Sequence, residues 1–358
     1  MGGICTCCTG PKPYSNTIPQ QNQTKKSPPN NIQQTQTYNK PELQMIEQKE
    51  NVDINYIIKE ETFKNFELKY SIEGHQDNII SLIELNNKKI MTASYDKKIK
   101  IWNTYNYKCE LTIEEEEKII CLIEFEPNII LIGTSSGKIN LWNLWDINNI
   151  KKEYSFIGHS LSVNCLVKCN ENIFASGSND TDIRIWDYSQ KQCINILKGH
   201  HSNIFCLIKL NNNKLCSGSA DKTLRIWNWK QNDCEMILKG HNSWVKSICQ
   251  LKNGNIISGS DDNSIIIWNN NYIKEKELKG HQGSIKSLCN INDKYFASGS
   301  FDKTIKIWDI NNEKCMQTLY EHKDKVICVL YHSNGYLISC SNDKTIKFWK
   351  QEEEQVLI

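Results

Sequence analysis

Hydrophobic and polar residues alternate in short segments along most of the chain, and turn-forming residues separate these segments. Residues 217–227, for example, read SGSADKTLRIW, in which Leu224 and Ile226 alternate with Arg225. This period of two predicts a strand, and a second strand is expected over residues 214–219, before the Ala-Asp-Lys turn. The pattern therefore predicts a β-hairpin at this place in the chain.

The same hairpin pattern recurs until close to the end of the chain. A tryptophan closes each copy, and successive tryptophans are separated by 40, 44, 41, 41, 40 and 41 residues. A nearly constant period of this length indicates a repeat architecture, in which similar units pack side by side. The seven closing tryptophans are Trp102, Trp142, Trp186, Trp227, Trp268, Trp308 and Trp349.

A second motif, a Gly-His pair, lies upstream of the hairpin in five copies, and Glu321-His322 is a variant of it in the last copy. Each of these His residues precedes the Asp of its turn by 21 residues, and each Asp precedes the closing Trp by six. Because both distances hold in six copies, we expect His, Asp and Trp to meet in space. These motifs resemble those of the WD40-repeat family, and the resemblance covers roughly residues 63–350.

The resemblance implies an all-β fold, a seven-bladed β-propeller of four-stranded antiparallel blades. It also implies a structural network in which Trp donates to a Ser or Thr, the hydroxyl to His, and His to Asp. A repeated catalytic dyad is the alternative, and the network is favoured because each donor finds an acceptor. The expected sets are His75, Thr92, Asp96 and Trp102; His159, Ser176, Asp180 and Trp186; His200, Ser217, Asp221 and Trp227; His241, Ser258, Asp262 and Trp268; His281, Ser298, Asp302 and Trp308; and His322, Ser339, Asp343 and Trp349.

The second repeat departs from this pattern, although Trp142 is present. Glu115 stands at the His position, Ser136 at the Asp position and Ile132 at the Ser position. The glutamates of residues 114–117 are interpreted as a solvated turn, with an acidic docking patch as the alternative. We expect the blade to form nonetheless, because its alternating strand is kept.

The composition argues against a nucleic-acid-binding or membrane-spanning protein. The chain has 358 residues, of which 39% are hydrophobic and 23% are charged, and its net charge is +2. A nearly neutral chain does not provide the basic surface on which nucleic-acid binding relies. No apolar run reaches the ~18–20 residues that span a bilayer. The N-terminus also lacks the basic flank and apolar core of a secretory signal.

The first eight residues, MGGICTCC, match an N-terminal acylation signal. Gly2 follows the initiator Met, and Thr6 lies at the Ser/Thr position of the myristoylation motif. Cys5, Cys7 and Cys8 are candidates for palmitoylation, and two lipid signals are needed for stable anchoring. A metal cluster is disfavoured because no second ligand pair follows, and a chance match is the other alternative. We therefore predict that residues 1–8 are acylated.

Residues 9–62 are predicted to be a disordered linker, because Pro, Gln and Asn dominate its composition. Residues 42–61 have a ragged helical spacing that favours a short helix packed on the propeller. A partner-binding helix, as in G-protein β subunits, is the alternative. Residues 66–72 alternate with period two, and no blade precedes them. We therefore expect this strand to complete blade seven and close a propeller of residues 63–358.

Thirteen cysteines follow the N-terminal three, and most occupy equivalent positions in successive repeats. This placement favours small packing side chains over disulfide partners, and free thiols are typical of the reducing cytosol. The sequence contains no Gly-rich phosphate loop, no zinc-ligand spacing and no nucleophile motif. We therefore predict a non-enzymatic protein without a metal site or cofactor.

In the family that the chain resembles, the wide face of the propeller carries the Gly-His loops and the turns before each Asp. Positions three after a His and one before an Asp are therefore candidates for binding cytosolic proteins or peptides. The predicted function is a scaffold, a monomeric propeller tethered to the cytosolic face of a membrane. A soluble adaptor, such as a ubiquitin-ligase substrate receptor or a component of a cytoskeletal or ciliary assembly, is the alternative. The candidate residues are Tyr95, Asn179, Trp244, Phe301, Lys325 and Asn342.

Overall fold

The computed structural model describes residues 63–146 and 150–352. The chain divides between Glu60 and Glu61 into two units, and every described residue belongs to the second. The predicted acylation signal and the linker, with the helix expected near residues 42–61, lie outside the described residues. In the described part, no helix has the length and apolar character needed to cross a membrane.

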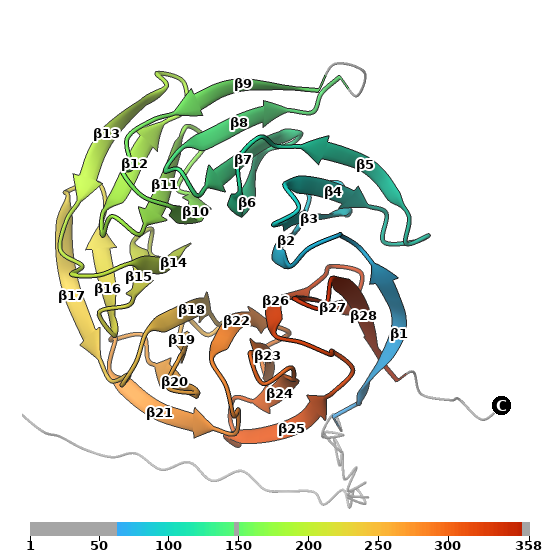
Figure 1. Ribbon diagram of the computed structural model, residues 1–358. Helices are drawn as coiled ribbons and strands as arrows, with labels where there is room; N and C mark the ends of the chain where they lie inside the picture. Colours follow the sequence, from blue (N-terminus) through green and yellow to red (C-terminus); the bar gives the residue numbers. More distant parts are fainter. Residues whose placement is uncertain (1–62, 147–149, 353–358) are drawn as a thin grey trace, which may run out of the picture. The chain divides into compact units, whose positions relative to one another are not determined.

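Seven four-stranded antiparallel sheets form a closed ring around a central axis (Figure 1). The innermost strands are β2 (Ile79–Glu84), β6 (Ile119–Glu126), β10 (Val163–Lys168), β14 (Ile204–Lys209), β18 (Val245–Gln250), β22 (Ile285–Asn290) and β26 (Val326–Tyr331). The outermost strands are β5 (Cys109–Glu114), β9 (Lys151–Phe156), β13 (Gln192–Leu197), β17 (Asp233–Lys239), β21 (Lys274–Lys279), β25 (Lys314–Leu319) and β1 (Phe66–Glu73). The fold is thus the predicted seven-bladed β-propeller.

The two middle strands of each blade are buried along most of their length, because neighbouring blades cover both of their faces. The second strands are β3 (Ile90–Ser94), β7 (Ile129–Thr134), β11 (Ile173–Ser178), β15 (Leu215–Ser219), β19 (Ile256–Ser260), β23 (Tyr295–Ser300) and β27 (Tyr336–Ser341). The third strands are β4 (Lys98–Trp102), β8 (Ile139–Asn143), β12 (Ile183–Asp187), β16 (Thr223–Asn228), β20 (Ser264–Trp268), β24 (Ile305–Asp309) and β28 (Thr345–Gln351).

The hydrophobic core lies between the blades, with one buried cluster at each of the seven interfaces. At the interface of blades five and six, for example, Ile265 and Ile267 of β20 pack with Phe296 and Trp308 of the next blade. The close packing explains the Ser-Gly-Ser sequence of β15. A Cβ atom at Gly218 would lie 2.6 Å from Cys206 Sγ and 2.7 Å from Val245 Cγ1 of the next blade.

The ring is closed by β1, which pairs antiparallel with β28 of the last blade along its whole length. Gln317 of blade six fixes the start of this strand. Its Oε1 accepts a hydrogen bond from Phe66 N–H at 2.7 Å, and its Nε2 donates to the Phe66 carbonyl at 2.8 Å. The sheet of blade seven therefore has the strand order β1-β28-β27-β26 and joins both ends of the propeller.

Candidate functional site

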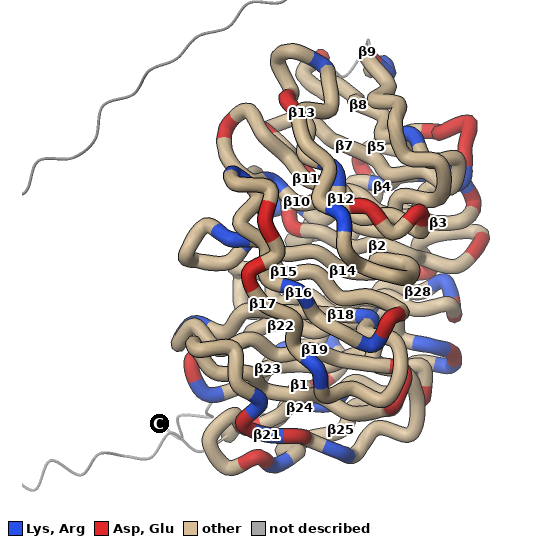
Figure 2. Tube along the Cα trace, turned by 90° about the vertical axis from the view of Figure 1, so that its left-hand side faces the viewer, with Lys and Arg blue, Asp and Glu red and all other residues tan. Residues whose placement is uncertain are grey.

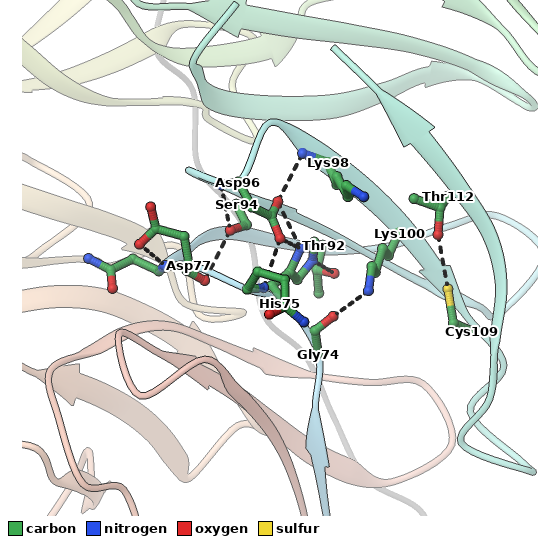
Figure 3. A network of polar contacts seen from close by, with 12 residues as sticks. Gly74, His75, Asp77, Thr92, Ser94, Asp96, Lys98, Lys100, Cys109 and Thr112 are labelled. Carbon is green, nitrogen blue, oxygen red and sulfur yellow. Dashed lines mark hydrogen bonds and ion pairs between the residues drawn. The ribbon is translucent and has the colours of Figure 1, made fainter.

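The His, hydroxyl, Asp and Trp side chains of blade one form a continuous hydrogen-bonded set. Figure 3 shows His75, Thr92 and Asp96 of this set. The Trp102 indole N–H donates to Thr92 Oγ1 at 2.8 Å, and Thr92 Oγ1 lies 2.8 Å from His75 Nε2. His75 Nδ1 lies 2.9 Å from Asp96 Oδ2. With the carboxylate accepting from Nδ1–H, Nε2 is left to accept the Thr92 hydroxyl. Each polar group of this set therefore has a partner.

Blades three to seven repeat this set with Ser in place of Thr. In these blades the Trp Nε1–Ser Oγ distances are 2.7–2.9 Å, and the His Nε2–Ser Oγ distances are 2.7–2.8 Å. The His Nδ1–Asp Oδ2 distances are 2.7–3.1 Å. The structure thus brings together the members of all six sets expected from the sequence.

The fixed spacing in the sequence follows from where the four side chains lie in a blade. His200, for example, lies in the loop before the innermost strand, Ser217 in the middle of β15, and Asp221 in the turn after it. Trp227 lies near the end of β16. An insertion between His and Trp would move one member away from the others, whereas the loop after each Trp is free to vary in length.

Burial and hydrogen bonding set the ionisation of these groups. Burial by itself would raise the pKa of Asp180, but hydrogen bonds from His159 and from backbone N–H groups outweigh it and lower the pKa to about 2. Burial lowers the pKa of His200 despite the Asp221 carboxylate. The six imidazoles have side-chain exposures of only 0–1%. A substrate cannot reach them, so the sets act as structural links and not as catalytic dyads.

Blade two uses a buried carboxylate in place of the His and Ser side chains. Glu115, at the His position, is 3% exposed, and its Oε2 accepts the Trp142 indole N–H at 2.8 Å. Lys152 Nζ lies 3.6 Å from Glu115 Oε1. Because Ile132 offers no hydroxyl, the longer Glu side chain reaches the indole directly.

The expectation of a solvated turn over residues 114–117 is therefore wrong for Glu115. Glu117 is also engaged, because it accepts the hydroxyl of Ser136 and pairs with Lys138 at 2.5 Å. Glu116 is solvent-exposed, as expected for a turn, with 87% of its side chain accessible. The sequence did not reveal that Glu115 replaces His and Ser as the partner of Trp142, because a run of Glu residues is usually on the surface.

Replacing Glu115 by Ala is expected to destabilise the propeller by about 1–3 kcal/mol, because the indole N–H of Trp142 loses its acceptor. Glu115→Gln keeps an acceptor oxygen, so we expect a smaller loss. The measurement is urea unfolding followed by circular dichroism. Glu116→Ala is the matched control, and its midpoint should equal that of the wild type. Equal midpoints for the two Ala variants would contradict this role of Glu115.

The channel mouth at the Gly-His end of the propeller, here called the wide face, has a regular rim. In each blade, the residue one before the Asp position donates its backbone N–H to the carbonyl of the residue three after the His position. Examples are Tyr95 to Asn78 at 3.0 Å, Asp261 to Trp244 at 2.9 Å and Asn342 to Lys325 at 3.0 Å. The candidate binding residues therefore lie side by side in pairs around one opening.

One known protein family matches this chain in sequence. The family model described as "WD domain, G-beta repeat" matches residues 66–103, 150–187, 191–228, 232–269, 273–309 and 313–350. These six matches cover most of the chain. The chain belongs to the WD40-repeat family. Residues 104–149 are not matched; they contain the outer strand of blade one and the first three strands of blade two, where the His, Ser and Asp positions are all changed. No curated protein matches the chain.

WD40 propellers are generally non-catalytic scaffolds that bind other proteins, so the accessible side chains of this WD40 propeller decide what it binds. A cavity of about 610 Å³ occupies the channel mouth. Five of the predicted binding residues line it: Tyr95, Asn179, Phe301, Lys325 and Asn342. Trp244 lies at its edge, 46% exposed, with its ring 5.6 Å from that of Phe205.

A second ring of residues in the cavity was missed from the sequence. Each innermost strand has a register shift at its second residue, which leaves that residue outside the pairing of the sheet. At such a β-bulge, the side chain does not follow the regular alternation between the two faces of the sheet. All seven bulge residues line the cavity. Each lies five positions after the His position of its repeat, and this constant distance could have identified them in the sequence. They are Ile80, Ile120, Asn164, Phe205, Lys246, Lys286 and Ile327.

Cysteines and serines follow the bulge residues and also line the channel. Several hold neighbouring blades together: Cys121 Sγ lies 3.4 Å from the Val163 carbonyl, and Ser247 Oγ lies 3.1 Å from that of Ile285. Burial raises the pKa of Cys121 to about 12, so this thiol is protonated and unreactive. The thirteen cysteines of the described residues are free. No group of three or more candidate ligands is placed to hold a metal within residues 63–146 and 150–352.

Proposed function

We propose that this protein is a non-catalytic scaffold that binds cytosolic proteins through its wide face and is held at a membrane by acyl chains on its N-terminus. The observation that carries the binding function is the contrast between two groups of side chains. The repeated His and Ser residues are buried and the side chains of the repeated Asp residues are only 7–11% exposed, whereas Trp244, Phe301 and Lys325 are accessible around the channel mouth. Aromatic side chains beside a concave opening are typical anchors for peptides.

The N-terminal sequence MGGICTCC supports the tethering function. A single myristoyl chain gives only marginal membrane binding, so Gly2 acylation requires palmitoylation of Cys5, Cys7 or Cys8 for a stable anchor. A tethered propeller raises the effective concentration of its partners at the membrane without any catalytic step. The propeller itself is proposed to be monomeric.

Membrane fractionation of the full-length protein from eukaryotic cells tests the tether. We expect most of the wild type in the membrane fraction and Gly2→Ala in the soluble fraction. The triple variant Cys5→Ser/Cys7→Ser/Cys8→Ser is expected to be distributed between both fractions, because a myristoyl chain alone binds reversibly. Metabolic labelling with alkyne analogues of myristate and palmitate identifies the chain at each site.

A soluble wild type would exclude the lipid anchor. The function would then be that of a soluble WD40 adaptor, such as a ubiquitin-ligase substrate receptor or a component of a cytoskeletal or ciliary assembly. Membrane binding by Gly2→Ala equal to that of the wild type would show that another part of the chain provides attachment. Both results would leave the protein-binding function of the wide face in place.

A further inference from the structure

The cavity at the channel mouth carries an excess of positive charge. Lys246, Lys286 and Lys325 line it, whereas none of the described residues that line it is Asp or Glu. On the side of the propeller, by contrast, basic and acidic residues are interspersed (Figure 2). The net charge of the whole chain is only +2. The positive charge is therefore a local property of the mouth.

Lys286 extends into the channel. Burial raises the pKa of the Cys206 thiol to about 12, and the charge of Lys286, which belongs to a strand two blades away, opposes this rise. The same ammonium group acts on the thiols of Cys121 and Cys328, in blades two and seven. Lys286 and these three cysteines line the same cavity, so its charge lies within the channel that the blades share. Among the described residues, no carboxylate forms an ion pair with Lys286.

Lys246 is enclosed by two aromatic rings. Its Nζ lies 3.4 Å from the ring centroid of Phe205 and 4.4 Å from that of Trp244. Burial lowers the pKa of Lys246 to about 8; the Asp261 carboxylate, at 3.8 Å, opposes this effect, and the charge of Lys286 adds to it. The ammonium groups of Lys246 and Lys286 therefore repel each other across the mouth, and an anion bound between them would stabilise both.

Aromatic rings accompany the charged groups around the mouth. Lys325 Nζ lies 4.8 Å from the ring centroid of Phe301, and Lys118 Nζ lies 3.7 Å from that of Tyr95. Apolar contact area and positive charge thus lie next to each other at the opening. A small inorganic anion would contact only the lysines, whereas a peptide that carries acidic and apolar side chains would use both kinds of surface.

We infer that the channel mouth binds an acidic segment of a partner protein, with Asp or Glu carboxylates between Lys246 and Lys286 and apolar side chains against Trp244 and Phe301. The inference rests on the proposed scaffold function and specifies the chemistry of the partner. The cavity volume of about 610 Å³ lies within the range of ligand pockets, roughly 300–1,000 Å³. Binding is expected to weaken with added salt, because its main attraction is between charges.

The affinity is also expected to fall as the pH rises. The pKa of Lys246 is about 8 in the free protein, and a bound carboxylate raises it. Binding is therefore strongest where Lys246 is protonated in both states, and it weakens as the pH rises through about 8. Asp261, Lys286 and the Cys206 thiol also face this ammonium group. Burial holds the pKa of that thiol at about 12, well above this range.

A random dodecapeptide phage library selected on the full-length protein tests the inference. We expect the retained peptides to be rich in Asp and Glu next to aromatic or aliphatic residues. Fluorescence anisotropy with the best retained peptide should show about tenfold or more loss of affinity in Lys246→Gln/Lys286→Gln. The control, Lys209→Gln/Lys252→Gln, removes the same charge from two exposed lysines outside the cavity and should bind like the wild type.

The possible results separate the inference from the proposed function. Neutral or basic peptides that depend on Trp244 and Phe301 would overturn the inference and leave the scaffold function intact. Acidic peptides that bind Lys246→Gln/Lys286→Gln as tightly as the wild type would also overturn it. If no peptide depends on any residue of the mouth, both the inference and the wide-face scaffold function fail.

Discussion

A chain that begins at Gly74, and so lacks β1, is expected to lose the cooperative unfolding transition of the propeller, whereas a chain that begins at Phe63 keeps it. Without β1, the backbone N–H and C=O groups of β28 that face β1 lose their partners, and β28 becomes an open edge that pairs only with β27. Phe66, which is 2% exposed, leaves the core between blades six and seven. Burial of one such side chain is worth about 1.5–3 kcal/mol. Together with the lost strand pairing, this approaches the whole stability of a typical domain, about 5–15 kcal/mol.

Thermal unfolding by circular dichroism, with size-exclusion chromatography, measures this effect. Gln317→Ala is the graded control, because it removes only the two hydrogen bonds to the Phe66 backbone. We expect it to unfold cooperatively, with a loss of about 1–3 kcal/mol. Adding a peptide of residues 63–73 should restore part of the transition of the truncated chain. A truncated chain with the melting curve of the wild type would show that the ring closes without β1.

Replacing Trp227 by Ala is expected to destabilise the propeller by about 3–5 kcal/mol, as for other large aromatic side chains in cores. Trp227 is 2% exposed and packs against Ile183, Ile185 and Leu197 of blade three. Its indole N–H also donates to Ser217 Oγ at 2.8 Å. The substitution therefore removes packing between two blades and one member of the hydrogen-bonded set. Trp227→Phe retains most of the packing, so we expect a smaller loss.

Urea unfolding measures the two Trp227 variants against Trp145→Ala. Trp145 is 67% exposed and lies in the loop after β8, so its removal should change the free energy of unfolding by no more than about 0.5 kcal/mol. A Trp227→Ala midpoint close to that of Trp145→Ala would contradict the structural role of the set. Equal losses for Trp227→Phe and Trp227→Ala would assign the effect to the hydrogen bond alone.

The architecture was readable from the sequence because it is repeated. Seven evenly spaced tryptophans, together with the resemblance to WD40 repeats, predicted seven blades, and the constant distances from His to Asp and from Asp to Trp predicted that these side chains meet in six of them. The rim positions of the wide face were implied by the resemblance to this family, and in the structure the residue three after His and the residue one before Asp share a backbone hydrogen bond in each blade. Trp244 and Tyr95 were found in this way.

Two features of the structure could not be predicted from the repeat pattern. Glu115 was interpreted as part of a solvated turn, yet it is buried and accepts the Trp142 indole N–H. The sequence shows that the His and Ser of the set are absent from blade two. Only the folded backbone shows that the Glu115 side chain is long enough to reach the Trp142 indole. Lys246 and Lys286 were also missed, since regular alternation does not show that a β-bulge directs both side chains into the channel.

The sequence by itself determined the number of repeats, and its resemblance to WD40 repeats gave the hydrogen-bonded sets and the rim positions, because these lie at constant distances along the chain within one repeat. The tertiary structure alone decided which charges share the channel mouth. Lys246 and Lys286 belong to different blades, and both line one cavity with the rim residue Lys325 only because the ring closes and β-bulges place the first two in the channel. Electrostatic repulsion between such groups depends on distance in space, which separation along the chain does not reveal.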